Sequence, residues 1–211
     1  MTESSSTANK PENKPSPKGS RRIPILLFIT AGLPVIFAFL MYFTDTLVPE
    51  GRNNRGSLIL PTLAVEKLAL QLEQAGEGSV EGKWELLVFG RNGCVSKNCQ
   101  EMLHNTRQVN VALGREAGRL ARRYINVDDA LTAPTLAEFK INYPRLHLSQ
   151  STVAALQVFL DKELDARQVV ERNFIFIADP LGNVMMYYTP ENLGGDILND
   201  LKKLLKVSNI G

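Results

Sequence analysis

Two cysteines, Cys94 and Cys99, are the residues of this 211-residue chain whose type and spacing best suit chemistry. An apolar run over residues 83–90 precedes them and is typical of a buried strand. From Lys97 onward, apolar side chains recur at helical spacing. We therefore expect the pair at a strand-to-helix junction. Unpaired amides and the helix dipole stabilise a thiolate there, and the thiolate is the form of cysteine that attacks disulfides and binds metals.

Three roles suit such a pair, and the spacing alone leaves all of them open. A redox pair is favoured by the basic residues Arg91 and Lys97, with Cys94 as the exposed attacking thiolate and Cys99 as the shielded resolving partner. A soft-metal site is the second role, because thiolates suit Cu(I). The third is a structural disulfide, which a loop-to-helix pair can form. Two unrelated thiols would be the alternative to all three.

The other candidate metal ligands, two histidines and two methionines, are expected to have structural rather than metal-binding roles. His104 lies just over one helical turn beyond Cys99 and is expected on the helix surface. His147 lies in a short Leu-His-Leu strand, and we expect it on the solvent face. Met185 and Met186 fall in a predicted hairpin, where we expect core packing rather than copper ligation.

Residues 23–44 form one long, uncharged apolar run. A helix needs about 20 apolar residues to cross a bilayer core, whereas the apolar region of a cleaved signal peptide has about 7 to 15. We therefore predict a single transmembrane anchor over residues 21–45. Residues 1–20 are basic and poor in apolar side chains, so we expect a disordered tail that the positive-inside rule places in the cytoplasm.

The remainder of the chain would then face the periplasm from a bacterial inner membrane, where disulfides persist. The net charge of +2 predicts no nucleic-acid partner. Residues 46–80 look like a linker and an N-terminal extension. Within them, 58–61 form a short apolar piece that a proline stops, and 63–74 have no clear element type.

Residues 81–211 predict one α/β domain with a thioredoxin-like central sheet flanked by helices. The predicted order is strand, helix, strand, helix, strand, helix, then two strands and a helix, and such alternation implies helices on both faces of the sheet. Ser149 or Ser151 is expected to cap the third helix. The expected strands are 83–90, 120–127, 146–148, 174–178 and 184–188, and the expected helices begin near 97, 132, 152 and 197.

The strand before the cysteines, the cysteine loop, the following helix and the segment 173–188 with its Asp-Pro-x-Gly hairpin resemble the Sco/SenC family. These are membrane-anchored, thioredoxin-like proteins that assist copper insertion into cytochrome c oxidase. The resemblance covers roughly residues 83–206 and the anchor. It implies oxidase assembly through thiol-disulfide exchange or copper handling at Cys94 and Cys99, with oxidase subunits or their assembly factors as partners.

The sequence departs from that family's pattern in two places. Four residues separate the cysteines where Sco proteins have three. No histidine precedes the Asp-Pro-x-Gly segment, and Glu171 falls nearest the place of the third copper ligand. Carboxylate is a poor ligand for Cu(I), so these departures favour thiol-disulfide exchange over copper.

Two alternatives to an exchange protein are a peroxidase and a non-catalytic module. Residues 89–93 lack the proline-and-threonine motif that precedes the peroxidatic cysteine of peroxiredoxins, which argues against a peroxidase. The competing prediction is a non-catalytic interaction module, tethered by the anchor and closed by a structural Cys94–Cys99 disulfide.

Overall fold

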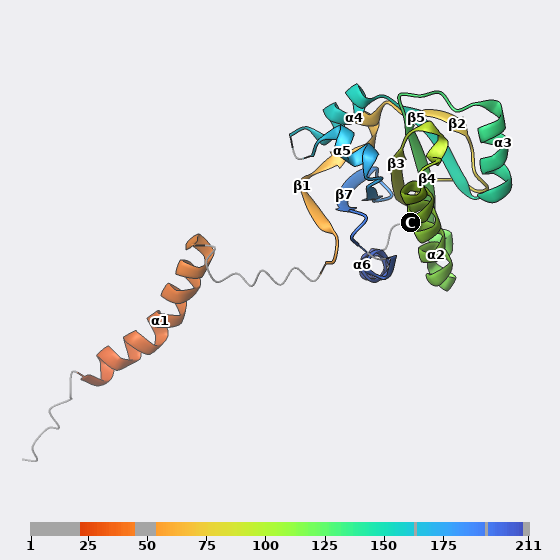
Figure 1. Ribbon diagram of the computed structural model, residues 1–211. Helices are drawn as coiled ribbons and strands as arrows, with labels where there is room; N and C mark the ends of the chain where they lie inside the picture. The colour runs from red at the N-terminus through yellow and green to blue at the C-terminus, as the bar shows by residue number, and fades with distance from the viewer. Residues whose placement is uncertain (1–21, 45–53, 163, 193, 209–211) are drawn as a thin grey trace, which may run out of the picture. The chain divides into compact units, whose positions relative to one another are not determined.

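The computed structural model describes residues 22–44, 54–162, 164–192 and 194–208 (Figure 1). The chain divides into two compact units, Met1–Gly51 and Arg52–Gly211. The first contains the helix α1 (Arg22–Thr44), so the apolar run is helical as expected. Within the described ranges, no helix has the length and apolar character needed to cross a membrane. The anchor over residues 21–45 stays a prediction, and the predicted tail of residues 1–20 lies outside the described residues.

The second unit is built on one seven-stranded mixed sheet. Its strands are β1 (Ser57–Ala64), β2 (Gln71–Gln74), β3 (Trp84–Gly90), β4 (Leu120–Val127), β5 (Leu146–Ser151), β6 (Ile175–Ala178) and β7 (Asn183–Tyr188). They lie in the order β1-β7-β6-β3-β4-β5-β2. The central strands β3, β4 and β5 are parallel, and the other pairings are antiparallel. The predicted hairpin of 174–178 and 184–188 is confirmed as β6 and β7.

Helices cover both faces of this sheet, as the alternation predicted. One face packs against α2 (Lys97–Ala112), α3 (Ala133–Asn142) and α6 (Gly194–Val207), and the other against α4 (Val153–Leu160) and α5 (Ala166–Glu171). Strand β3 shows why, because Leu86 and Val88 belong to the first core and Leu87 and Phe89 to the second. A central strand buried on both faces is expected to be almost continuously apolar. The short 3-10 turns are η1 (Val65–Leu68), η2 (Asn92–Cys94) and η3 (Gly114–Arg119).

The described part of the predicted N-terminal extension belongs to the sheet. Strands β1 and β2 form its two edges, so the sheet reaches beyond the expected start at residue 81. The apolar piece 58–61 is not stopped by Pro61, because β1 continues to Ala64. Proline lacks a backbone donor, and an edge strand is the place where a sheet tolerates it.

The third predicted helix begins near residue 152, as expected, but its N-cap is neither of the two expected serines. Its N-cap is Thr152, whose Oγ1 accepts a hydrogen bond from the Ala155 amide at 3.1 Å. The expected caps, Ser149 and Ser151, are instead buried residues of β5. Ser151 donates its hydroxyl proton to the Leu68 carbonyl at 2.7 Å, so its side chain is engaged in holding η1 against the sheet.

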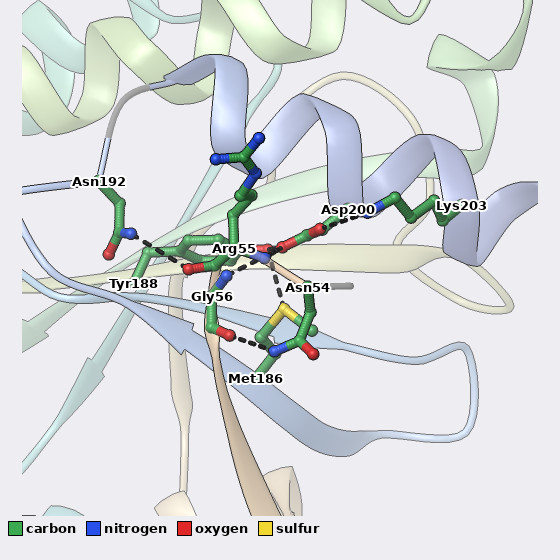
Figure 2. Close-up of polar contacts among 8 residues, drawn as sticks. All are labelled: Asn54, Arg55, Gly56, Met186, Tyr188, Asn192, Asp200 and Lys203. Carbon is green, nitrogen blue, oxygen red and sulfur yellow. Dashed lines mark hydrogen bonds and ion pairs between the residues drawn. The ribbon is translucent and has the colours of Figure 1, made fainter. Parts of the chain in front are cut away.

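A buried carboxylate, Asp200 of α6, fastens the chain before β1 to the closing helix (Figure 2). Its Oδ2 accepts hydrogen bonds from the Arg55 and Gly56 amides at 2.7 and 2.9 Å and from the Tyr188 hydroxyl at 3.1 Å. Gly56 fits because an added Cβ would lie 2.6 Å from the Tyr188 ring. Burial and the neighbouring carboxylate raise the pKa of Tyr188, which therefore stays protonated as a donor.

Candidate functional site: a disulfide beside a cleft

The two cysteines meet between the end of β3 and the first turn of α2, as predicted, and they form a disulfide. Their Cα atoms are 5.3 Å apart, within the usual range for a bridged pair. Ser96 caps α2, and its Oγ accepts a hydrogen bond from the Cys99 amide at 3.2 Å. The helix face that contains Cys99, Met102, Leu103, Thr106 and Val109 is buried, which confirms the predicted period.

Both half-cystines are buried in the core between α2, α3 and the sheet. Cys99 is 1% exposed, as predicted, but Cys94 is only 3% exposed, so the expectation of an exposed Cys94 is wrong for the disulfide form. The reason is local, since Asn92, Gly93 and Cys94 all have positive φ, at 52°, 66° and 61°. Three successive left-handed residues curl the loop back toward the sheet instead of projecting it into solvent.

Cys94 nevertheless borders a cleft, whereas Cys99 does not line it. The cleft has a volume of about 260 Å³ and lies between the cysteine loop, the start of α2, and α3. Gln100, Glu138 and Asn142 contribute polar groups, and apolar groups come from Val95, Leu103 and Phe139. The sequence analysis placed α3 but gave it no part in the site. Its contribution depends on tertiary packing, which no local pattern reveals.

Asn126, at the end of β4, holds the cysteine loop in place. Its fully buried side chain accepts hydrogen bonds from the Gly93 amide at 3.1 Å and from the Tyr124 hydroxyl at 3.0 Å, and it donates to the Asp129 carbonyl. Burial raises the pKa of Tyr124, against the opposing effect of a hydrogen bond from the Cys94 amide. Tyr124 is therefore neutral and available as a donor. Sequence reasoning missed both residues, because they occur inside an ordinary strand pattern.

A second polar bridge joins the cysteine loop to the segment before β6. The Asn98 side-chain amide donates to the Arg172 carbonyl at 3.1 Å and to Asn173 Oδ1 at 3.0 Å. Asn173 in turn donates to the Phe89 and Val170 carbonyls, both at 3.1 Å. This bridge joins the end of β3 and the end of α5 to the loop that separates the cysteines.

The basic residues expected to act on the thiols lie at the surface. Lys97 has a side chain that is 90% exposed and pairs with Glu101 at 3.8 Å. Arg91 is also exposed. Water screens such charges strongly, so the helix terminus rather than Lys97 is the main local source of thiolate stabilisation.

Neither histidine lines the cleft beside Cys94. His104 is on the surface of α2, as predicted, with its Nε2 2.7 Å from Gln108 Nε2. His147 was expected on the solvent face but is only 5% exposed, because β2 and the residues just after it cover the edge of β5. Its Nδ1 accepts a hydrogen bond from the Gly76 amide at 3.1 Å. Burial, followed by the charge of Arg123, lowers the pKa of His147.

The methionines and the carboxylates also give no metal centre. Met186 is a core residue, as expected, and Met185 packs against the same core. Glu171, nearest the place of the third copper ligand in the family pattern, is exposed at the end of α5. Within the described ranges, no three His, Cys, Asp or Glu side chains are grouped closely enough to hold a metal ion.

A parallel βαβ unit with a cysteine pair at the start of its helix, closed by a hairpin and a helix, defines a thioredoxin-like protein. The chain belongs to the family described as transmembrane-like, thioredoxin-like, C-terminal domain, whose model matches residues 84–208. No curated protein matches the sequence.

The similar solved structures include several Sco proteins. BsSco, described as a member of the Sco family of cytochrome c oxidase assembly proteins with a disulfide switch, is 19% identical over 70% of this chain and 96% of its own, with a TM-score of 0.51. Apo Sco1 from Thermus thermophilus is 15% identical over 71% and 95%, with a TM-score of 0.49. Copper-bound yeast Sco1 is 18% identical over 61% and 82%, with a TM-score of 0.48. The resemblance to Sco proteins is thus confirmed at the level of the fold.

Proposed function

We propose that this protein is a membrane-anchored, periplasmic, thioredoxin-like factor that assists cytochrome c oxidase assembly by thiol-disulfide exchange at Cys94 and Cys99. The observation that carries the proposal is that Cys94, one half of a disulfide at a helix terminus, lines a cleft. A disulfide that serves only stability has no need of such access. The fold-level likeness to BsSco, described as having a disulfide switch, supports an oxidase-related partner.

The exchange runs through Cys94. A partner thiolate enters the cleft and attacks the Cys94 sulfur, the bond between the two cysteines breaks, and Cys99 leaves as a thiolate at the amino end of α2. A second thiolate of the partner then attacks the partner's sulfur in the mixed disulfide, and Cys94 leaves as a thiolate. The partner dithiol loses two electrons and becomes a disulfide, while the Cys94–Cys99 pair gains them. The reverse sequence of steps reduces a partner disulfide.

The proposed location is supported by the residues before the domain. Helix α1 contains the uncharged apolar run, and basic residues outnumber acidic ones before that run, which supports an anchor with its N-terminus in the cytoplasm. The periplasm then supplies the oxidising conditions in which the disulfide persists.

Copper binding at Cys94 and Cys99 depends on the redox state of the pair. The disulfide offers no thiolate, so the oxidised residues do not fit a copper site. Reduction would expose two soft sulfur ligands, and within the described residues no third His, Cys, Asp or Glu side chain is grouped with them. Any copper bound by the reduced pair would therefore depend mainly on the Cys94 and Cys99 thiolates.

The second candidate function is a non-catalytic, tethered interaction module. The burial of both half-cystines in the apolar core favours it, because structural disulfides are typically shielded from thiols.

Trapping of mixed disulfides distinguishes the two candidates. Cys99→Ser in the full-length chain should accumulate a mixed disulfide between Cys94 and a protein of the same membrane, because the resolving thiol is gone. Cys94→Ser, the matched control, should accumulate far less. Equal trapping by both variants, or by neither, would favour the interaction module.

A further inference from the structure

Arg122 of β4 is a buried cation that has no partner among the described residues. It is only 5% exposed, and its Nη1 is buried with no hydrogen-bond partner in the described structure. None of the ion pairs among the described residues includes it. Buried charges in proteins are almost always paired, because an unpaired one is costly to remove from water.

The charges around Arg122 increase this cost. Burial is the main effect that lowers the pKa of Arg122 to about 10, and the positive charges of Arg107 and Arg145 lower it further, with Tyr143 acting in the opposite direction. Because this value is still well above 7, the guanidinium is charged at neutral pH. The one nearby carboxylate lining the same space, Glu77, is already engaged with Arg145 at 3.9 Å.

Two cavities adjoin Arg122. The larger, of about 330 Å³, is also lined by Lys83, Asn110 and Arg145. The smaller, of about 180 Å³, is also lined by Arg107, Asn110 and Arg145. The Asn110 side-chain amide donates to the carbonyls of Ala117 and Leu120, so Asn110 adds no free donor to this space. The charged donors that line it are Lys83, Arg107, Arg122 and Arg145.

This cluster of Lys83, Arg107, Arg122 and Arg145, which we call the cationic site, lies at the opposite end of the sheet from the disulfide. Lys83 immediately precedes β3, Arg145 immediately precedes β5, and Arg122 is near the start of β4. These strands are parallel, and the cysteines follow the far end of β3. The cationic site is therefore separate from the exchange chemistry and does not depend on it.

We propose that the cationic site binds a phosphate group, supplied by inorganic phosphate or a small phosphate monoester, with Arg122 as its central ligand. A guanidinium presents donors in a fork that matches two oxygens of such an anion, and Lys83 adds a point charge. A dianion neutralises more of the accumulated positive charge than a carboxylate does. The larger cavity has room for more than the bare anion, so it also accommodates the organic part of a monoester.

Isothermal titration of the full-length chain in detergent with inorganic phosphate, and separately with glycerol 3-phosphate, tests the proposal. Arg122→Gln should weaken binding of both by about tenfold or more, the loss expected when a charge-assisted ligand of a phosphate is removed. Arg167→Gln, an exposed arginine on α5 with the same change in charge, is the matched control and should bind like the wild type. Binding that Arg122→Gln leaves unchanged, or that Arg167→Gln weakens equally, overturns the proposal.

A second variant tests the proposal even if Arg122→Gln does not fold. Arg145→Gln alters an exposed residue that lines both cavities, and it should weaken phosphate binding at least several-fold with an unchanged thermal midpoint in phosphate-free buffer. Acetate, tested at the same ionic strength, should bind more weakly than phosphate. Equal affinities for acetate and phosphate would contradict a phosphate site.

Discussion

Asn126 is predicted to be the residue on which the cysteine loop depends most. Replacement by alanine removes the acceptor of the Gly93 amide and of the Tyr124 hydroxyl and the donor to the Asp129 carbonyl. The hydroxyl keeps a long contact with the Arg91 carbonyl, at 3.4 Å, so about two groups lose their partner fully. A buried group without its partner costs about 1–3 kcal/mol, which gives about 2–6 kcal/mol for two groups. Because Gly93 is half-buried and Asp129 is exposed, we expect Asn126→Ala to lower the free energy of unfolding by the smaller part of that range, about 2–4 kcal/mol.

Denaturant unfolding of the full-length chain in detergent measures this loss. Trp84 is the single tryptophan, is 4% exposed in the core beside α2, and reports on the domain alone by its fluorescence. Asn199→Ala, at an exposed position on α6, is the control and should change stability by less than about 0.5 kcal/mol. The Asn126 variant should also be reduced faster by dithiothreitol, because its loop is less well held. A loss no larger than that of the control would refute the role given to Asn126.

Asp200→Asn should lower the free energy of unfolding by about 1–2 kcal/mol, because the neutral amide loses the charge assistance of the three hydrogen bonds to Oδ2. Denaturant titration measures it, and an unchanged midpoint would contradict the fastening of the chain before β1. The anaerobically reduced chain should bind Cu(I) through Cys94 and Cys99, and Glu171→His should tighten that binding. Competition with a Cu(I) chelator measures both affinities. An unchanged affinity in the histidine variant would show that residue 171 does not correspond to the family's third ligand. A reporter active only in the periplasm should work when fused to the C-terminus, whereas an active cytoplasmic reporter there would refute the predicted topology.

The parts of the fold that were predictable have strong local patterns. The period of Cys99, Met102 and Leu103 indicated the buried face of α2, and the Asp-Pro-Leu-Gly turn indicated the β6–β7 hairpin. The position of the cysteines at a strand-to-helix junction followed from the change of period. Local pattern was sufficient in these places because propensity, turn residues and burial all favour the same structure.

The features that were missed depend on tertiary contacts. Pro61 argues against a strand in isolation, yet β1 forms because an edge position tolerates proline. The pattern of its own strand predicts that His147 faces solvent, but the pairing of β2 with β5 buries it. The burial of Cys94 results from three left-handed residues, of which only Gly93 has an obvious sequence signal.

The reduction potential of the Cys94–Cys99 pair tests the central claim most directly. The full-length chain is equilibrated in a series of thiol redox buffers, and the oxidised fraction is read from the mass added by alkylation of the free thiols. An exchange pair should have a potential between about −270 and −120 mV, the range of known thiol-disulfide exchange proteins. A potential below about −300 mV, the range of structural disulfides, would contradict the exchange mechanism and support the tethered interaction module.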